Sequence, residues 1–207
     1  MTRPEIAYAV GQVAQHCQNP GRLHWKAVQR ILSYLAGKRQ HGLLYGPRNH
    51  LKAFSDADYA GDSDSRKSTT GYVFLLNGAA ISWSGKKQKC TAQSTTEAEF
   101  VASSEAGKEA VWILRGLKEL EGDVPTPMEL FMDNQSAIRI IRNPELHQRT
   151  KHIDVRYHFI RELQEQGVID AKYVNTNEQL ADILTKPLAA PRFQRLRQEL
   201  GIVETPI

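Results

Sequence analysis

Cysteine is scarce in this 207-residue chain, which contains only two. Cys17 and Cys90 lie far apart and match neither a disulfide framework nor the paired spacing of a zinc cluster. The scarcity excludes a disulfide-stapled secreted domain and a cysteine-ligated zinc domain. We therefore expect a protein of a reducing compartment.

Long apolar stretches are missing as well. No run approaches the roughly 18 residues that a membrane-spanning helix needs. Residues 1–4, Met-Thr-Arg-Pro, have none of the apolar core of a signal peptide. Internal repeats and low-complexity segments are also absent. We therefore expect an intracellular protein without a membrane partner, and the sequence leaves its oligomeric state open.

The composition is that of an ordinary globular protein, with 41% hydrophobic and 24% charged residues. A chain of this length can hold one domain with a substantial core and an appendage. The net charge of +4 weakly favours an anionic partner, but many proteins with this charge never bind nucleic acid. Composition alone leaves the function open.

The first part of the chain differs from the rest. Apolar residues recur at helical spacing over residues 4–17 and again over 24–36, with a break at Gln18-Asn-Pro-Gly between them. A basic, glycine-rich stretch at 38–49 follows and is interpreted as a connector. We predict that residues 1–48 form a helical segment that packs on another part of the protein.

From residue 51 the pattern becomes that of strands. Three strands are predicted at 51–59, 71–76 and 80–84, and Asn77-Gly78 is a strong hairpin signal between the last two. Helices and strands then alternate: helix 95–120, strand 128–133, helices 134–142 and 150–166, strand 169–174, and helices 177–186 and 191–200. This order predicts an α/β fold in which helices pack on the faces of a sheet.

Four acidic residues stand at the edges of hydrophobic elements, where an ordinary sequence would place apolar side chains. The elements are strand, helix, strand and helix, and the residues are Asp56, Glu99, Asp133 and Asp182. Burying four carboxylates near one another is prohibitive without cations. Oxygen ligands suit hard divalent ions, above all Mg²⁺, and two such ions can hold the attacking and leaving oxygens of a phosphodiester. The pattern predicts a metal-dependent nuclease.

Glu99 is favoured over its neighbour Glu97 because of its position on the predicted helix. Glu99 lies four residues before Ser103 and so continues the buried stripe of that helix. Glu97 is roughly 200° around the helix from Glu99. A negative charge near a helix N-terminus is favourable by itself, so Glu97 is interpreted as a structural residue that follows the cap candidates Ser94 and Thr95.

The other three acids have alternatives that the sequence leaves open. Asp58 shares the strand face of Asp56, although its place near the strand end suits a turn-forming role. Asp133 ends a predicted strand, where open α/β sheets bind ligands, but a cap on the next helix is the alternative. Asp182 lies within a predicted helix, where aspartate has poor propensity, and an exposed charge is its alternative.

Several longer sequence motifs contain these acids or lie between them. They are Ser55-Asp-Ala-Asp-Tyr-Ala-Gly-Asp, Arg66-Lys-Ser-Thr-Thr-Gly-Tyr, Ser94-Thr-Thr-Glu-Ala-Glu-Phe, Asp133-Asn-Gln-Ser-Ala and Gln179-Leu-Ala-Asp-Ile-Leu-Thr-Lys-Pro-Leu. In this order, over residues 51 to about 190, they closely resemble the ribonuclease H domain of copia-type retrotransposon polyproteins. Two earlier strings, Thr2-Arg-Pro-Glu-Ile-Ala-Tyr and His24-Trp-Lys-Ala-Val-Gln-Arg, resemble the end of the reverse transcriptase in the same polyproteins.

This resemblance implies a ribonuclease H-like fold: a five-stranded mixed sheet in strand order 3-2-1-4-5, with helices on both faces. It implies cleavage of the RNA strand of an RNA–DNA hybrid during reverse transcription, with 5′-phosphate and 3′-hydroxyl products. Its four metal-binding acids, which hold two Mg²⁺ ions with Mn²⁺ as a substitute, correspond here to Asp56, Glu99, Asp133 and Asp182. Asp154, in the first turn of a predicted helix, is the alternative for the fourth place.

The resemblance also implies that the hybrid is recognised by its shape, through 2′-hydroxyls and backbone phosphates. Candidate contact residues flank the acids or form a basic cluster: Ser94, Thr95, Asn134, Gln135, Ser136, Lys86 and Lys87. For the lysines, a solvated loop is the alternative. The implied partners are the RNA–DNA hybrid and the reverse-transcriptase portion of the polyprotein.

The expected organisation is a helical segment at 1–48, a ribonuclease H-like domain at 49–190 and a helical tail at 191–207. The expected location is the cytoplasm, in a retroelement particle, with the nucleus as an alternative. A competing function from another class is a catalytically inactive nucleic-acid-binding remnant of such a polyprotein. Metal-dependent cleavage distinguishes the two functions.

Overall fold

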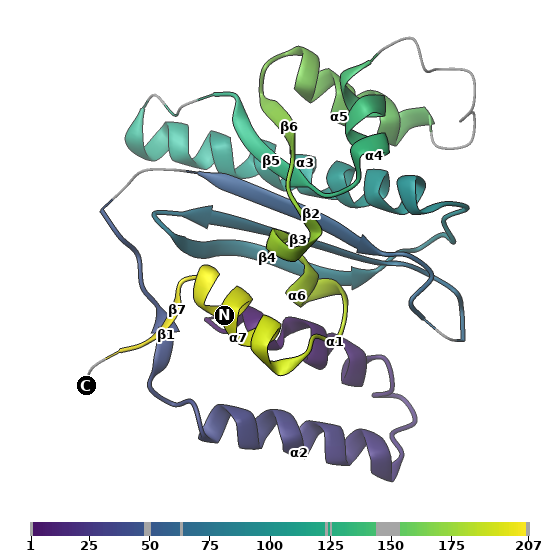
Figure 1. Ribbon diagram of the computed structural model, residues 1–207, viewed down its shortest axis with the longest axis vertical. Coiled ribbons are helices and arrows are strands. Elements are labelled where there is room, and N and C mark those ends of the chain that lie inside the picture. The colour runs from purple at the N-terminus through teal and green to yellow at the C-terminus, as the bar shows by residue number, and fades with distance from the viewer. Residues whose placement is uncertain are drawn as a thin grey trace.

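A central five-stranded sheet organises the computed structural model in Figure 1. The structure describes residues 2–47, 51–62, 64–122, 124, 126–143 and 154–205, with side chains at all of these except 121 and 154–157. The strands are β2 (Lys52–Asp58), β3 (Thr69–Leu76), β4 (Ala79–Lys87), β5 (Met128–Met132) and β6 (Ile169–Tyr173).

The strands lie side by side in the order β4-β3-β2-β5-β6. β2, β3 and β4 pair antiparallel, whereas β2, β5 and β6 pair parallel. Numbered along the chain, this is the predicted mixed sheet with order 3-2-1-4-5. The predicted fold class is therefore confirmed.

Helices cover both faces of this sheet, as Figure 1 shows. One face carries α3 (Thr95–Glu121), α4 (Gln135–Arg142) and α5 (Asp154–Glu165). The other face carries α1 (Ala7–Ala14), which follows the short η1 (Pro4–Ile6), together with α6 (Asp182–Thr185) and α7 (Ala190–Glu199). α2 (Arg22–Ala36) lies outermost, beyond α1. Each face has its own cluster of buried apolar side chains.

Small side chains bring α3 close to the sheet. Ala98, Ala102, Ala106 and Ala110 recur every four residues, and all four are fully buried. Because these side chains are short, the helix axis approaches the strands more closely than larger residues would allow. The buried stripe predicted for this helix is confirmed, and Glu99 lies on it near the N-terminal end.

The opposite face is closed by segments that are far apart in the sequence. β1 (His41–Leu43) pairs antiparallel with β7 (Ile202–Glu204) in a separate two-stranded sheet. Leu196, Leu200 and Ile202 are buried in one cluster with residues of α6. The interpretation of 38–49 as a connector missed β1, because a three-residue strand that depends on a distant partner has no local signal. The domain boundaries at 48 and 190 stay a prediction.

The prediction of one helix over residues 177–186 is wrong. The structure instead has a short turn of 3₁₀ helix, η3 (Thr176–Glu178), then an extended break, and then α6. Gln179 accounts for the break, because its fully buried amide donates to the carbonyl oxygen of Ser55 at 3.0 Å. This tertiary hydrogen bond overrides the local preference for helix. Asp182 is consequently the first residue of α6.

The remaining predicted elements are present with shifted boundaries. The strand predicted at 80–84 extends to Lys87, and the helix predicted at 150–166 is described from Asp154 onward, so its first residues lie outside the described part. The predicted hairpin is confirmed, with φ of 55° at Asn77 and 82° at Gly78. Gly201, at φ 80°, follows α7 as the predicted stop.

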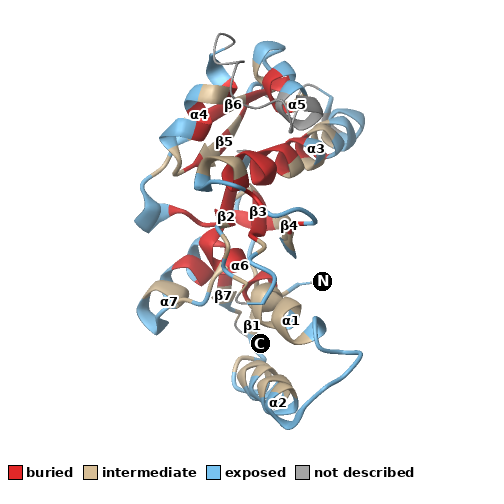
Figure 2. Ribbon diagram, turned by 90° about the vertical axis from the view of Figure 1, so that its right-hand side faces the viewer, coloured by how far each residue is buried: buried red, intermediate tan, exposed pale blue. Residues whose placement is uncertain are grey.

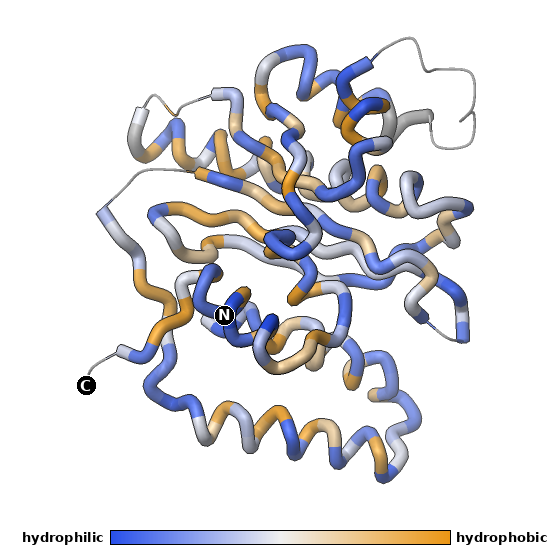
Figure 3. Tube along the Cα trace, in the orientation of Figure 1, coloured by the Kyte–Doolittle hydropathy of each residue, from blue (hydrophilic) through white to orange (hydrophobic). Residues whose placement is uncertain are grey.

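α2 exposes large apolar side chains. Leu23, Trp25 and Leu32 are 77%, 60% and 56% exposed. The helix has no buried residue in Figure 2, and orange apolar positions alternate with blue polar ones along it in Figure 3. Tyr34 connects it to α7 through an edge-on contact with Phe193, at 5.9 Å between ring centroids. In the described part of the chain, no helix is both long and apolar enough to cross a membrane.

A pair of glycines makes room for α6. Gly71 of β3 is level with Gly85 of β4 on one side and with Asp56 of β2 on the other. A Cβ atom at Gly85 would lie 2.6 Å from the carbonyl oxygen of Leu184, and one at Gly71 would lie 2.5 Å from Cγ2 of Thr185. α6 therefore rests directly on the backbone of β3 and β4, next to Asp56.

We expect Gly85→Ala to lower the free energy of unfolding by about 1–3 kcal/mol, because the added methyl group meets the backbone of α6. Gly116→Ala is the matched control. It lies within α3 with open space around it, so the same change should raise stability by about 0.5–1 kcal/mol. Chemical denaturation measures both changes. A Gly85→Ala protein as stable as the unmodified chain would contradict this tight seating of α6.

Candidate active site

The ends of β2 and β5 bring two of the predicted acids together. These strands are parallel, and Phe54 of β2 is level with Phe131 of β5. Asp56 and Asp133 each follow two residues later, so both lie just beyond the last paired residues of the parallel strands, near their carboxyl ends. The carboxyl ends of parallel strands are where open α/β sheets bind ligands.

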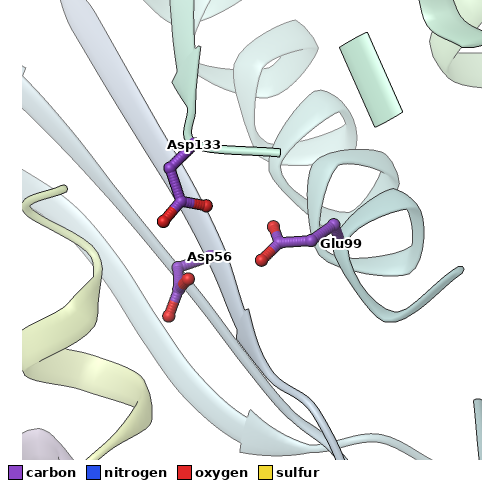
Figure 4. Close-up of side chains that lie close together, drawn as sticks. All are labelled: Asp56, Glu99 and Asp133. Carbon is purple, nitrogen blue, oxygen red and sulfur yellow. The ribbon is translucent and has the colours of Figure 1, made fainter. Parts of the chain in front are cut away.

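Glu99 joins them from α3. Figure 4 shows the three carboxylates close together, and one oxygen from each lies within 4.8 Å of the others. Asp56 and Glu99 are only 1% and 6% exposed, whereas Asp133 is half-buried. The backbone amide of Ala57 donates to Oε1 of Glu99 at 3.2 Å. The structure thus unites three of the four predicted acids in one cluster.

Positive charge meets this cluster at Asp56, where Nζ of Lys186 lies 3.4 Å from Oδ2, but no described lysine or arginine pairs with Glu99 or Asp133. Oε2 of Glu99 is buried and has no hydrogen-bond partner in the described part of the chain. Burial first, and then the charges of Asp56 and Asp133, hold the pKa of Glu99 well above its ordinary value. A hard divalent cation would satisfy the free oxygen and offset the repulsion between the carboxylates. The donor set therefore fits a divalent metal ion.

Asp182 lies beside Asp56 but outside this three-residue cluster. It is fully buried, so the alternative of an exposed charge is excluded. Two cations hold its carboxylate: Nζ of Lys186 is 2.8 Å from Oδ1, and Arg192 donates to Oδ2. Burial, and then the charge of Asp56, raises the pKa of Asp182 to about 7. The side chain of its rival, Asp154, lies outside the described part of the structure.

Three residues of the site escaped the sequence analysis. Thr185 donates its hydroxyl to Oδ2 of Asp56, and Nζ of Lys186 lies 3.4 Å from the same oxygen. Burial alone would lower the pKa of Lys186, but Asp56 and Asp182 outweigh burial and raise it. Lys186 follows Asp182 at i+4 spacing, which is a visible signal for an ion pair. Arg192 has no such signal, because tertiary packing of α7 brings it to the site.

Glu97 has the structural role that was predicted for it, and the alternative role of Asp58 in a turn stays a prediction. The backbone amide of Gln93 donates to Oε2 of Glu97 at 2.7 Å, and the amide of Glu97 donates to Oγ of Ser94 at 3.1 Å. This reciprocal arrangement caps the N-terminus of α3. Asp58 lies against the turn at Gly61, where an added Cβ would be 1.8 Å from its Oδ2.

Five of the predicted nucleic-acid contacts lie at two helix N-termini next to the acids. Ser94 caps α3, and Asn134 caps α4 by accepting a hydrogen bond from the amide of Ala137 at 3.0 Å. The exposed residues beside these caps are Thr95, Gln135 and Ser136. Their position is compatible with contacts to a bound strand, and their role stays a prediction.

The two predicted basic contacts lie at the end of β4. Lys86 is exposed, whereas Lys87 pairs with Asp62. In the sheet register, Lys86 is level with Thr70 and, through it, with Ala57. Two strand spacings of about 4.8 Å therefore separate its backbone from the residue that follows Asp56. Lys86 is the better placed of the two to meet a phosphate backbone.

Comparison with known proteins adds independent information. No protein-family model matches the chain. It is 48% identical over 202 residues to the retrovirus-related Pol polyprotein from transposon TNT 1-94 of Nicotiana tabacum, covering 97% of this chain and 15% of that protein. It is 42% identical over 207 residues to the corresponding polyprotein from transposon RE2 of Arabidopsis thaliana, covering 99% of this chain and 14% of that protein. Among solved structures, LC11-RNase H1 from compost is similar with a TM-score of 0.46 and 14% identity, covering 73% of this chain and 93% of that one.

The sheet order and the helices on both faces define a ribonuclease H-like fold. The chain belongs to the family of copia-type, retrovirus-related Pol polyproteins, as its resemblance predicted. It spans about one seventh of the length of these relatives, from 14% to 15%.

The raised pKa values predict how the stability of the metal-free chain depends on pH. Asp182 has an ordinary pKa of 3.8 and a folded pKa of about 7, so between these values the folded chain holds a proton that the unfolded chain has lost. The free energy of unfolding should therefore fall as the pH rises from about 4 to about 7, and Glu99 acts in the same direction. Asp182→Asn should reduce the fall.

Urea denaturation in chelator at pH 5 and pH 7.5 measures this effect. Asp170→Asn is the control, because Asp170 forms an exposed ion pair with Arg142 at 2.9 Å, away from the acids. It should keep the pH dependence of the unmodified chain. Identical pH dependence in the unmodified chain and in Asp182→Asn would show that Asp182 is not the group responsible.

Proposed function

We propose that this chain hydrolyses the RNA strand of RNA–DNA hybrids in a divalent-metal-dependent reaction of retrotransposon reverse transcription. The products would be 5′-phosphate and 3′-hydroxyl ends. One observation carries the proposal: Asp56, Glu99 and Asp133 converge at one edge of a ribonuclease H-like sheet, and a buried oxygen of Glu99 there lacks a partner. Membership of the Pol polyprotein family supports it.

Asp56, Glu99 and Asp133, together with Asp182, would hold two Mg²⁺ ions, with Mn²⁺ as a substitute. When bound, such ions would activate a water nucleophile and offset the charge on the departing 3′ oxygen. The protein supplies fixed positions for the ligands. The hydroxyl of Thr185 orients Asp56, and the amide of Ala57 orients Glu99. These contacts keep the carboxylates in place in spite of their mutual repulsion.

The hybrid would lie across the N-termini of α3 and α4. Backbone amides and helix dipoles at such ends favour phosphate groups, and the exposed hydroxyl and amide groups there can contact 2′-hydroxyls. The candidates are Ser94, Thr95, Asn134, Gln135 and Ser136, with Lys86 and Lys87 toward the edge of the sheet. We further propose the reverse-transcriptase portion of the polyprotein as a partner, and the cytoplasmic retroelement particle as the location.

Asp133→Asn should abolish cleavage of the RNA strand, by at least about 100-fold, while the fold is retained. Loss of a residue that only supports a metal ligand already costs up to about 100-fold, and Asp133 would be a ligand itself. In chelator, the variant should melt slightly higher than the unmodified chain, because one of the repelling charges is gone. The assay uses a labelled hybrid with Mg²⁺, Mn²⁺ or chelator.

Asp170→Asn serves again as the control with an intact cluster. Cleavage that survives in chelator or in Asp133→Asn would mean that the acids do not carry the reaction. Intact RNA under both metals, with the hybrid bound, would instead identify an inactive binding remnant.

Glu97→Gln and Glu99→Gln should differ sharply in their rates of RNA cleavage, although the residues are only two positions apart. Glu99→Gln should abolish cleavage, because it removes a carboxylate from the cluster. Glu97→Gln should leave cleavage largely intact and lower stability by about 1 kcal/mol or less, because it weakens only a helix cap. Cleavage rates and melting temperatures of both variants decide this. Equal loss of activity would show that the helix-face assignment is wrong.

A further inference from the structure

Lys186 occupies the place between Asp56 and Asp182. Its Nζ atom is 2.8 Å from Oδ1 of Asp182 and 3.4 Å from Oδ2 of Asp56. A Mg²⁺ ion shared by these two carboxylates would need the same place, because its oxygen ligands lie only about 2.0–2.1 Å away. The ammonium group and such an ion cannot occupy it together.

The cations of the site are distributed unevenly. Both oxygens of Asp182 are engaged, one by Lys186 and the other by Arg192. Among the residues that the structure describes, no lysine or arginine pairs with Glu99 or Asp133, and one buried oxygen of Glu99 has no partner. Positive charge is therefore concentrated beside Asp182 and Asp56, whereas Glu99 and Asp133 have no paired cation among the described residues.

We propose that Lys186 is a built-in cation that takes the place of the second metal ion in the chain alone. The chain alone then binds one divalent ion, on Asp56, Glu99 and Asp133, and a second ion enters only when Lys186 withdraws. This inference rests on the proposed function, because the same acids hold the ions. It makes Lys186 a residue that controls metal occupancy.

The surroundings of Lys186 allow it to withdraw. Its side chain is 28% exposed and stands at the C-terminal end of α6. It also lines a cavity of about 710 Å³, bordered by residues of α1, α2 and α7 that include Tyr8, Gln12 and Phe193. Because the ammonium group sits on a flexible four-carbon stem, it can leave the carboxylates without a change in the backbone.

Counting bound ions tests this inference without reference to activity. Mn²⁺ is titrated into the full chain in the absence of nucleic acid, with the free ion followed by electron paramagnetic resonance and the heat by calorimetry. We expect one ion on the unmodified chain and two on Lys186→Met, with the affinity for the second ion raised at least tenfold. Lys89→Met, at an exposed position, is the matched control and should bind one.

The outcomes separate this inference from the proposed function. Two ions on the unmodified chain, or a single ion of unchanged affinity on Lys186→Met, would overturn the role of Lys186 and leave a metal-dependent nuclease standing. No bound ion on either protein would overturn the metal site, and the proposed function with it.

Lys186→Met leaves two buried acids without their shared cation and can therefore weaken the fold. A second variant keeps the test conclusive in that case. Arg192→Gln also removes a cation from Asp182 but keeps Lys186 in place. We expect it to bind one ion, as the unmodified chain does, with melting curves in Mn²⁺ confirming that both variants are folded. Two ions on Arg192→Gln would show that Lys186 does not exclude the second one.

Discussion

Repulsion among buried carboxylates is the constraint to which the rest of this structure responds. Asp56 interacts with acids on both sides, and in the protein interior such like charges repel strongly. On the side of Asp182, Lys186 and Arg192 supply positive charge. On the side of Glu99, the compensation is a hydrogen bond from a backbone amide and the more distant charge of Lys186. This asymmetry makes the cluster that contains Glu99 the stronger place for a divalent ion.

Holding these charges together requires helices that approach the sheet closely from both faces. On one face the buried alanines of α3 bring Glu99 down to β2, and on the other Gly71 and Gly85 let α6 rest on the strand backbones. A catalytic arrangement tolerates only about 0.5 Å of displacement, which is less than the thickness of a methyl group. These small residues therefore belong to the site, although they touch no ligand.

Much of this arrangement could be predicted because it follows from local pattern. The period of a strand places Asp56, the stripe of a helix separates Glu99 from Glu97, and the end of a strand places Asp133. The features that were missed depend on residues distant in sequence. The break before α6 comes from a hydrogen bond between Gln179 and Ser55, which are 124 positions apart. Neither this hydrogen bond nor the position of Arg192 beside Asp182 can be predicted from the local sequence.

The segment after residue 190, predicted to be a tail, takes part in the electrostatics of the site. Arg192 donates a hydrogen bond to one oxygen of Asp182. Leu196 and Leu200 bury their side chains in the hydrophobic cluster that contains residues of α6. β7 then pairs with β1, which ties the same segment to the N-terminal region. A boundary at 190 would leave Asp182 buried with one cation fewer, and burying an uncompensated charge is costly. Residues beyond 190 therefore contact the site through Arg192 and support α6 through Leu196 and Leu200.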